Sequence, residues 1–182
     1  MSDRASPLGA DFKPGQYGNL AIGVGVMLSE PQYGFLGELA AFPASVGTVT
    51  KLAGAAADAP GAIYFKIAAN RWFVAGSEGT DVLIAAKLKP ADGSLINLSH
   101  GRTALRISGP KAEWVLSKLY PIDFSVAAFS TGVGLSTTHH SIFTQIYRHD
   151  EETFDLFVFG SLALSFWHTL RGAADEAGYE VV

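Results

Sequence analysis

The sequence predicts an α+β fold made of two similar lobes, in which helices pack on antiparallel sheets. One observation is that strand-like segments with period two alternate with segments whose apolar residues recur at helical spacing. The other is a repeat, because residues 71–88 resemble residues 155–171 at a constant offset. The matched pairs are Phe73 and Phe157, Val74 and Val158, Gly76 and Gly160, and Ser77 and Ser161. Each copy has a strand, a Gly-Ser pair and an amphipathic helix. This indicates a duplication, although chance similarity between two common units is the alternative.

The chain has 182 residues, enough for one domain with two lobes sharing a core. We expect a flexible N-terminal arm over residues 1–18, where the sequence is polar and interrupted by Pro and Gly and has no apolar signal core. The two lobes are expected at about residues 19–95 and 96–182.

The first lobe contains six expected elements before the lobe boundary. They are a strand at Leu20–Met27, a short helix at Phe35–Ala41, a helix at Val46–Ala53, two strands at Ala62–Ala68 and Arg71–Ala75, and a helix at Thr80–Leu88. Pro43 follows the first helix. Thr80 is expected to cap the last one, which Pro90 follows.

The second lobe begins with the clearest local pattern. Thr103–Ile107 alternates like a strand, and Gly109-Pro110 then ends it. The apolar residues Ala112, Val115, Leu116 and Leu119 share one helical face, and Pro121 closes that helix because the residue before a proline avoids the helical conformation. Two strands are expected at Ile142–Tyr147 and Thr153–Phe159. A long final helix carries Leu162, Phe166, Leu170 and Ala173 and ends near Gly178.

Composition limits the possible functions. Charged residues make up only 16% of the chain, against ~25% in typical soluble domains, so we expect part of the surface to be covered by a partner. The net charge of −4 and the absence of a basic stripe argue against nucleic acid. No cysteine is present, which agrees with a cytoplasmic location. The apolar run at Leu156–Trp167 is shorter than the ~20 residues of a membrane helix, so no membrane association is expected.

No catalytic, cofactor-binding or metal-ligating residue is predicted on this chain. Gly23-Val24-Gly25 lacks the third glycine of a dinucleotide-binding loop. Ser77 lies in a sequence that imitates a nucleophile elbow, but a turn with a helix cap is the simpler explanation. His139, His140 and His149 are expected to be solvated loop residues, because adjacent residues of a strand point to opposite faces.

The segment from Ser99 to Asp123 resembles the gamma subunit of heterotetrameric sarcosine oxidase. The resemblance comprises the S-H-G-R phrase at residues 99–102, the L-R-I-S-G-P-K-A phrase at residues 105–112, and the P-I-D phrase at residues 121–123. It continues through Thr153–Leu170, with a D-x-[FY] strand, a Ser and an apolar helix containing Trp. The S-G-P-x-A phrase also resembles the wider folate-binding aminomethyltransferase-like superfamily, whose duplicated α+β fold the resemblance implies here.

The resemblance further implies a non-catalytic structural subunit of a complex that oxidatively demethylates sarcosine to glycine. Its partners would be larger flavoprotein alpha and beta subunits. FAD, FMN, NAD and tetrahydrofolate would bind to those subunits, with no cofactor on this chain. The alternative is a stand-alone folate-binding or aminomethyltransferase-like protein, for which Asp123 would be the signature acid.

Five residues are candidates for an interface or for the family signature. They are Ser99, His100, Arg102, Asp123 and Trp167. Arg102 would bind a partner carboxylate through two hydrogen bonds, with an internal salt bridge as the alternative. Trp167 and Leu164 lie off the main stripe of the last helix, so that helix is apolar on nearly all sides and either docks to a partner or lies in a thick core.

Overall fold

The structure is a computed structural model that describes residues 5–57 and 61–182. It has the predicted α+β class, with helices packed on largely antiparallel sheets. Contacts divide the chain into a larger unit, residues 1–31 and 103–182, and a smaller unit, residues 32–102. The sequence analysis placed residues 19–31 with the first lobe. The structure groups them with the C-terminal half because β2 (Val26–Ser29) pairs with β7 (Arg102–Ser108) and β11 (Tyr179–Val181).

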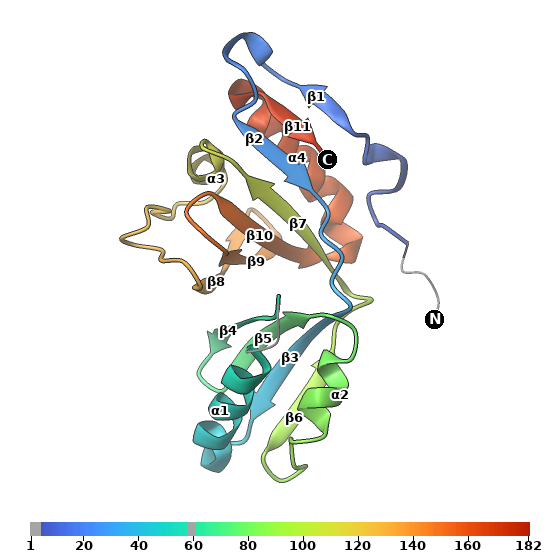
Figure 1. Cartoon of the computed structure of the whole chain (residues 1–182), viewed down its shortest axis with the longest axis vertical. Coiled ribbons are helices and arrows are strands. Elements are labelled where there is room, and N and C mark those ends of the chain that lie inside the picture. The colour runs from blue at the N-terminus through green and yellow to red at the C-terminus, as the bar shows by residue number, and fades with distance from the viewer. Residues whose placement is uncertain (1–4, 58–60) are drawn as a thin grey trace. The chain divides into compact units, whose positions relative to one another are not determined.

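The smaller unit is a four-stranded antiparallel sheet with two helices on one face (Figure 1). Its strand order is β4 (Ile63–Ala68), β5 (Arg71–Gly76), β3 (Phe35–Ala41) and β6 (Gly93–Asn97). The helices are α1 (Val46–Ala57) and α2 (Thr80–Ala85), and the one-turn η3 (Pro43–Ser45) precedes α1. The core of this unit joins Leu39 and Trp72 of the sheet to Val49 of α1 and Ile84 of α2.

The larger unit is built on a seven-stranded sheet. The order is β1 (Gly15–Tyr17), β11, β2, β7, β10 (Thr153–Phe159), β9 (Ile142–Arg148) and β8 (Gly134–His139). The β11–β2 pair is parallel, while the pairs β1–β11, β2–β7, β10–β9 and β8–β9 are antiparallel. Helices α3 (Ala112–Leu119) and α4 (Ala163–Ala174) contact each other, and four one-turn helices complete the unit: η1 (Gly9–Asp11), η2 (Leu20–Ile22), η4 (Gly160–Leu162) and η5 (Asp175–Ala177).

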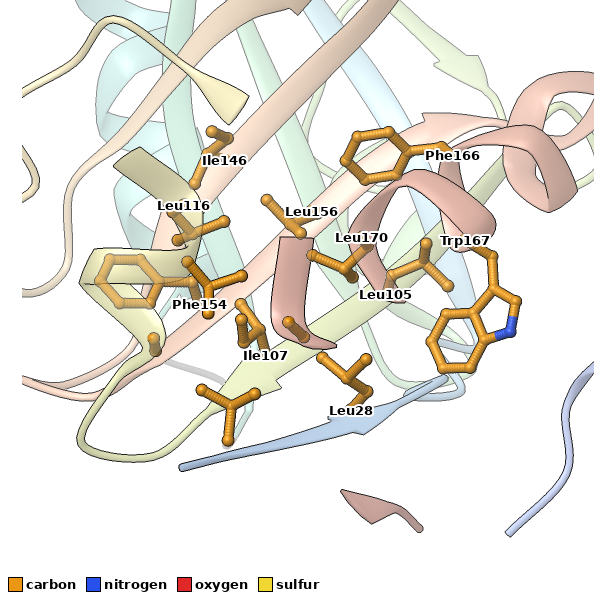
Figure 2. Packing of buried hydrophobic residues seen from close by; sticks show 14 of the residues in the cluster. Leu28, Leu105, Ile107, Leu116, Ile146, Phe154, Leu156, Phe166, Trp167 and Leu170 are labelled. Carbon is orange, nitrogen blue, oxygen red and sulfur yellow. The ribbon is translucent and has the colours of Figure 1, made fainter. Parts of the chain in front are cut away.

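The core of the larger unit lies between this sheet and its two helices. Figure 2 shows Leu105 and Leu156 from neighbouring strands facing Phe166 and Leu170 of α4, with Leu116 of α3 on the other side of the cluster. These five side chains are fully buried. Alternate residues of the strands supply this face, which is what period-two patterning predicts. No helix in the described parts of the chain is long and apolar enough to cross a membrane.

The N-terminal segment differs from the flexible arm expected over residues 1–18, of which residues 1–4 lie outside the described part. Residues 15–17 form β1 and pair with β11. Leu8 is buried, and the Phe12 ring lies 5.7 Å from the Trp167 ring. Pro and Gly indicated an irregular backbone, but this segment is held by pairing and packing that involve the C-terminal part of the chain.

Most predicted elements are present, but the structure differs from the prediction at three places. The strands expected at residues 62–68, 71–75, 103–107, 142–147 and 153–159 correspond to β4, β5, β7, β9 and β10, and the helix expected at residues 112–119 is α3. Phe35–Ala41, expected to be a helix, is strand β3. Of the Leu20–Met27 segment, only its last two residues lie in strand β2. Thr80 begins α2 but does not cap it, because Gly79 occupies the N-cap position.

Gly109 of the signature requires glycine. Its φ is +118°, and a Cβ atom there would lie 2.8 Å from the carbonyl oxygen of Gly25. We therefore expect Gly109→Ala to lower the free energy of unfolding by about 1–3 kcal/mol. The matched control is Gly172→Ala, since Gly172 lies within α4 with open space around it, and it should stabilise by about 0.5–1 kcal/mol. Urea unfolding of both variants checks this; a loss for Gly172→Ala equal to that for Gly109→Ala would contradict it.

Candidate functional site

The signature segment runs through both units. Ser99 and His100 lie in the turn between β6 and β7, and Arg102 begins β7. Asp123 follows α3 in the loop of residues 120–133, and Trp167 lies on α4. The structure therefore distributes the five candidates over two regions: the first three in the smaller unit, the other two in the larger unit.

Ser99 is a buried structural residue. Its Oγ accepts a hydrogen bond from the Leu36 N–H at 3.0 Å and lies 3.3 Å from the Leu36 carbonyl oxygen. Its own N–H donates to Asn97 Oδ1 at 2.9 Å. These bonds fix the β6–β7 turn to the start of β3, so the first residue of the S-H-G-R phrase has a role within the fold.

His100 is exposed in the same turn, and Arg102 is half-buried. Burial lowers the pKa of Arg102, while the carboxylate of Glu38 on β3 acts in the opposite direction and raises it. Glu38 forms an ion pair with Arg71 at 2.5 Å, so both roles offered for Arg102, binding a partner carboxylate and an internal salt bridge, stay predictions.

Asp123 and Trp167 occupy different environments. Asp123 is exposed, and its Oδ1 accepts a hydrogen bond from the Ser125 N–H at 2.9 Å. That backbone hydrogen bond lowers the pKa of Asp123. Trp167 is fully buried, and its Nε1 lies 3.3 Å from the Asp11 carbonyl oxygen, to which it donates. The interface role expected for Trp167 has no exposed surface to support it, because the N-terminal segment packs against the indole.

The sequence analysis missed a polar cluster on the sheet of the larger unit. Arg106 of β7 donates from Nε and one Nη atom to the two carboxylate oxygens of Asp155 on β10, at 2.7 and 3.0 Å. His149 Nε2 lies 3.0 Å from Asp155 Oδ2. Asp155 is fully buried, whereas about a third of the Arg106 side chain and a quarter of the His149 side chain are exposed. The Arg of L-R-I-S-G-P and the Asp of D-x-[FY] thus form one ion pair.

The electrostatics of this cluster follow from its contacts. Burial acts to raise the pKa of Asp155, but the hydrogen bonds and charges of His149 and Arg106 outweigh burial, so this pKa lies below its ordinary value. Burial also raises the pKa of the nearby Tyr147 phenol, and the Asp155 charge raises it further. Two parallel Arg–carboxylate bonds define a fixed geometry. The cluster therefore connects β7 to β10 through an ion pair with a buried carboxylate. Within the described residues, no three His, Asp or Glu side chains are grouped so that they could hold a metal ion.

Arg148, at the end of β9, is a second buried cation that the sequence analysis did not identify. Its guanidinium donates to the carbonyl oxygens of Phe124 and Phe129, at 2.5 and 3.0 Å, and to Glu113 Oε1 at 2.5 Å. It also donates to the carbonyl oxygens of Asp150 and Glu151. The 120–133 loop, which carries Asp123, is thereby held in one conformation.

Comparison of sequences identifies curated relatives, although no family model matches the chain. The sarcosine oxidase subunit gamma of Corynebacterium sp. (strain P-1) is 32% identical over 107 residues, which are 59% of this chain and 52% of that protein. The sarcosine oxidase subunit gamma of Arthrobacter sp. is 31% identical over 121 residues, covering 63% of this chain and 58% of that protein. The chain thus spans slightly more than half the length of the curated relatives it matches.

Comparison of structures identifies the fold. A chain of the heterotetrameric sarcosine oxidase from Corynebacterium sp. U-96, solved with pyrrole 2-carboxylate, matches with a TM-score of 0.78 and 22% identity over 96% of both chains. The glycine cleavage system aminomethyltransferase T from Bartonella henselae matches with a TM-score of 0.61 and 16% identity, over 87% of this chain and 48% of that one. The α+β fold of this chain is therefore similar to the folds of these two proteins. By sequence, about three-fifths of the chain is similar to two sarcosine oxidase gamma subunits, so the predicted resemblance is confirmed.

Proposed function

We propose that this chain is the gamma subunit of a heterotetrameric sarcosine oxidase-like complex, which oxidatively demethylates sarcosine to glycine. The observation that carries the proposal is the identity of 32% and 31% with two proteins named sarcosine oxidase subunit gamma. In this complex the chain is a non-catalytic assembly subunit. It binds larger flavoprotein alpha and beta subunits in the cytoplasm, and those subunits carry FAD, FMN, NAD and tetrahydrofolate.

The exposed side chains support an assembly role. Large apolar residues that are more than 40% exposed occur in both units; in the larger unit they include Ile22, Met27, Trp114, Val126 and Phe159, and in the smaller unit Phe42, Val82 and Leu83. Single exposed apolar residues are common on any protein. Together with a charged fraction of only 16%, this surface composition favours partner contacts, whose cores are depleted of charge.

Co-expression with the larger subunits tests the proposed function. We expect the chain to co-purify with them as one complex that oxidises sarcosine, whereas the purified chain alone should not turn sarcosine over. Size-exclusion chromatography and an oxygen-uptake assay measure the two outcomes. Titration of the purified chain with tetrahydrofolate tests the alternative. If the chain binds tetrahydrofolate and does not bind the larger subunits, the proposed function is replaced by that of a stand-alone folate-binding protein.

A further inference from the structure

The exposed side of α3 and the adjoining loop form a hollow of about 480 Å³ on the larger unit. Its lining includes Pro110 from the turn before the helix, Trp114 and Ser117 from the helix, and Asp123 and Ser125 from the 120–133 loop. Helix α3 lies within the signature segment (Figure 1). We call Trp114 of the helix the aromatic wall of the hollow, and we call the acidic residues Glu113 of the helix and Asp123 of the loop its polar wall.

Trp114 forms the aromatic wall, and it is the exposed tryptophan of this chain. Its exposed fraction is 44%, against 3% for Trp72 and 0% for Trp167, and these are all three tryptophans of the sequence. The Lys118 Nζ lies 3.6 Å from the centroid of the Trp114 ring. When a partner covers an exposed aromatic residue, a large apolar area is removed from water. Trp is therefore common among the residues that contribute most of the binding energy of an interface.

The polar wall has negative charge. Asp123 and Glu113 line the hollow, and its lining residues include no Lys or Arg. Glu113 is already bonded to Arg148, so Asp123 supplies the uncompensated charge. The Ser125 N–H donates to the Asp123 carboxylate and lowers its pKa, and an exposed Asp is ionised at neutral pH in any case.

The two walls are fixed relative to each other by buried contacts within the larger unit. Arg148 binds the carbonyl oxygens of Phe124 and Phe129 in the loop and the carboxylate of Glu113 on α3. One buried guanidinium thus ties the helix that carries Trp114 to the loop that carries Asp123. A surface that is ordered before binding loses less conformational entropy when a partner docks.

We infer that this hollow binds an arginine side chain of one of the larger subunits, with the guanidinium bonded to Asp123 and packed against Trp114. The inference deepens the proposed function and rests on it. Arginine fits better than lysine because its planar guanidinium both stacks on aromatic rings and donates two parallel hydrogen bonds to a carboxylate. A neutral or acidic segment would leave the Asp123 charge without a partner in a contact that excludes water.

Competition between tagged copies of the full-length chain tests the inference. Wild-type chain and a variant with a different tag are co-expressed with the larger subunits, and the ratio of tags in the purified complex reports relative affinity. We expect Trp114→Ala to be under-represented by about 30-fold or more. Asp123→Asn, which keeps the acceptor for the Ser125 N–H, should be under-represented by about 10-fold or more, as for loss of a charge-assisted bond. Asp175→Asn, which removes the charge of an exposed residue of η5, serves as the control and should compete equally.

A cross-linking experiment gives a second readout that does not depend on affinity. Since the chain has no cysteine, Ser117→Cys places a single thiol in the hollow, and a benzophenone on it should cross-link to an arginine-containing peptide of a larger subunit. Equal incorporation of Trp114→Ala and Asp123→Asn into a complex that forms normally, or a cross-link to a peptide without arginine, overturns the inference alone. Failure of the wild-type chain to assemble instead overturns the proposed function.

Discussion

Replacement of Arg148 by methionine is expected to lower the free energy of unfolding by about 3–5 kcal/mol, the range for removing one partner from a buried charged network. Methionine has a similar length, so the change removes charge and hydrogen-bond donors more than volume. The carbonyl oxygens of Phe124, Phe129, Asp150 and Glu151 would lose the donors that the structure gives them. Each buried acceptor left without a partner costs about 1–3 kcal/mol.

Urea unfolding at neutral pH measures this effect, and two variants provide controls. Arg171→Met changes a half-buried arginine whose Nε donates to the Tyr179 hydroxyl at 2.8 Å, and it should cost about 1 kcal/mol. Glu113→Gln removes the carboxylate partner of the buried Arg148 but keeps a hydrogen-bond acceptor, and the four carbonyl oxygens keep their donor, so we expect a smaller loss of about 1–3 kcal/mol. Similar losses for Arg148→Met and Arg171→Met would show that the 120–133 loop does not depend on Arg148.

The β3 segment shows why the sequence predicted some elements incorrectly. Phe35–Ala41 lies between β5 and β6, and five of its seven residues are buried, so no alternation of polar and apolar residues marks it as a strand. Such continuous apolar runs cannot be distinguished from a buried helix by periodicity. Its Leu, Glu and Ala residues also favour a helix intrinsically. Pairing with two neighbouring strands, which depends on the whole fold, overrides that preference.

Strand β8 was not predicted, for the opposite reason. Its sequence, GLSTTH, is polar and half-exposed at the edge of the sheet, so it has no apolar face by which to recognise it. By contrast, β7 and α3 were predicted closely because alternating residues, a Gly-Pro stop and one apolar helical face all agree there. Sequence reasoning succeeds where local signals are consistent with the fold.

The polar residues of the larger unit were harder to predict than its elements. His149 was expected to be a solvated loop residue, but its Nε2 lies 3.0 Å from the buried Asp155 carboxylate. Arg106 and Asp155 are 49 positions apart, and only the β7–β10 neighbourhood brings them together. A buried acid in an otherwise apolar strand, Thr153–Phe159, was the available signal, because a buried charge requires a partner.

That buried acid leads to the second large effect. We expect Asp155→Asn to lower the free energy of unfolding by about 3 kcal/mol at pH 7, the lower end of the cost of breaking a buried ion pair. The lower end applies because Arg106 is about one-third exposed, so water can partly solvate the charge that remains. Asn retains the shape of Asp but cannot accept the two charge-assisted hydrogen bonds from Arg106 equally well.

The pH dependence of this loss identifies its cause. The pKa of Asp155 is below its ordinary value in the folded protein, so the folded state binds fewer protons than the unfolded state near the ordinary pKa of ~3.9. The carboxylate therefore stabilises the fold above that pH, and the contribution is lost as the pH falls through the folded pKa. The difference between wild type and Asp155→Asn should shrink as the pH falls below about 4. Asp175→Asn, which removes the same charge from an exposed position, should leave the profile unchanged. A loss for Asp155→Asn that does not vary with pH would mean that packing at this position, and not the ion pair with Arg106, stabilises the junction of β7 and β10.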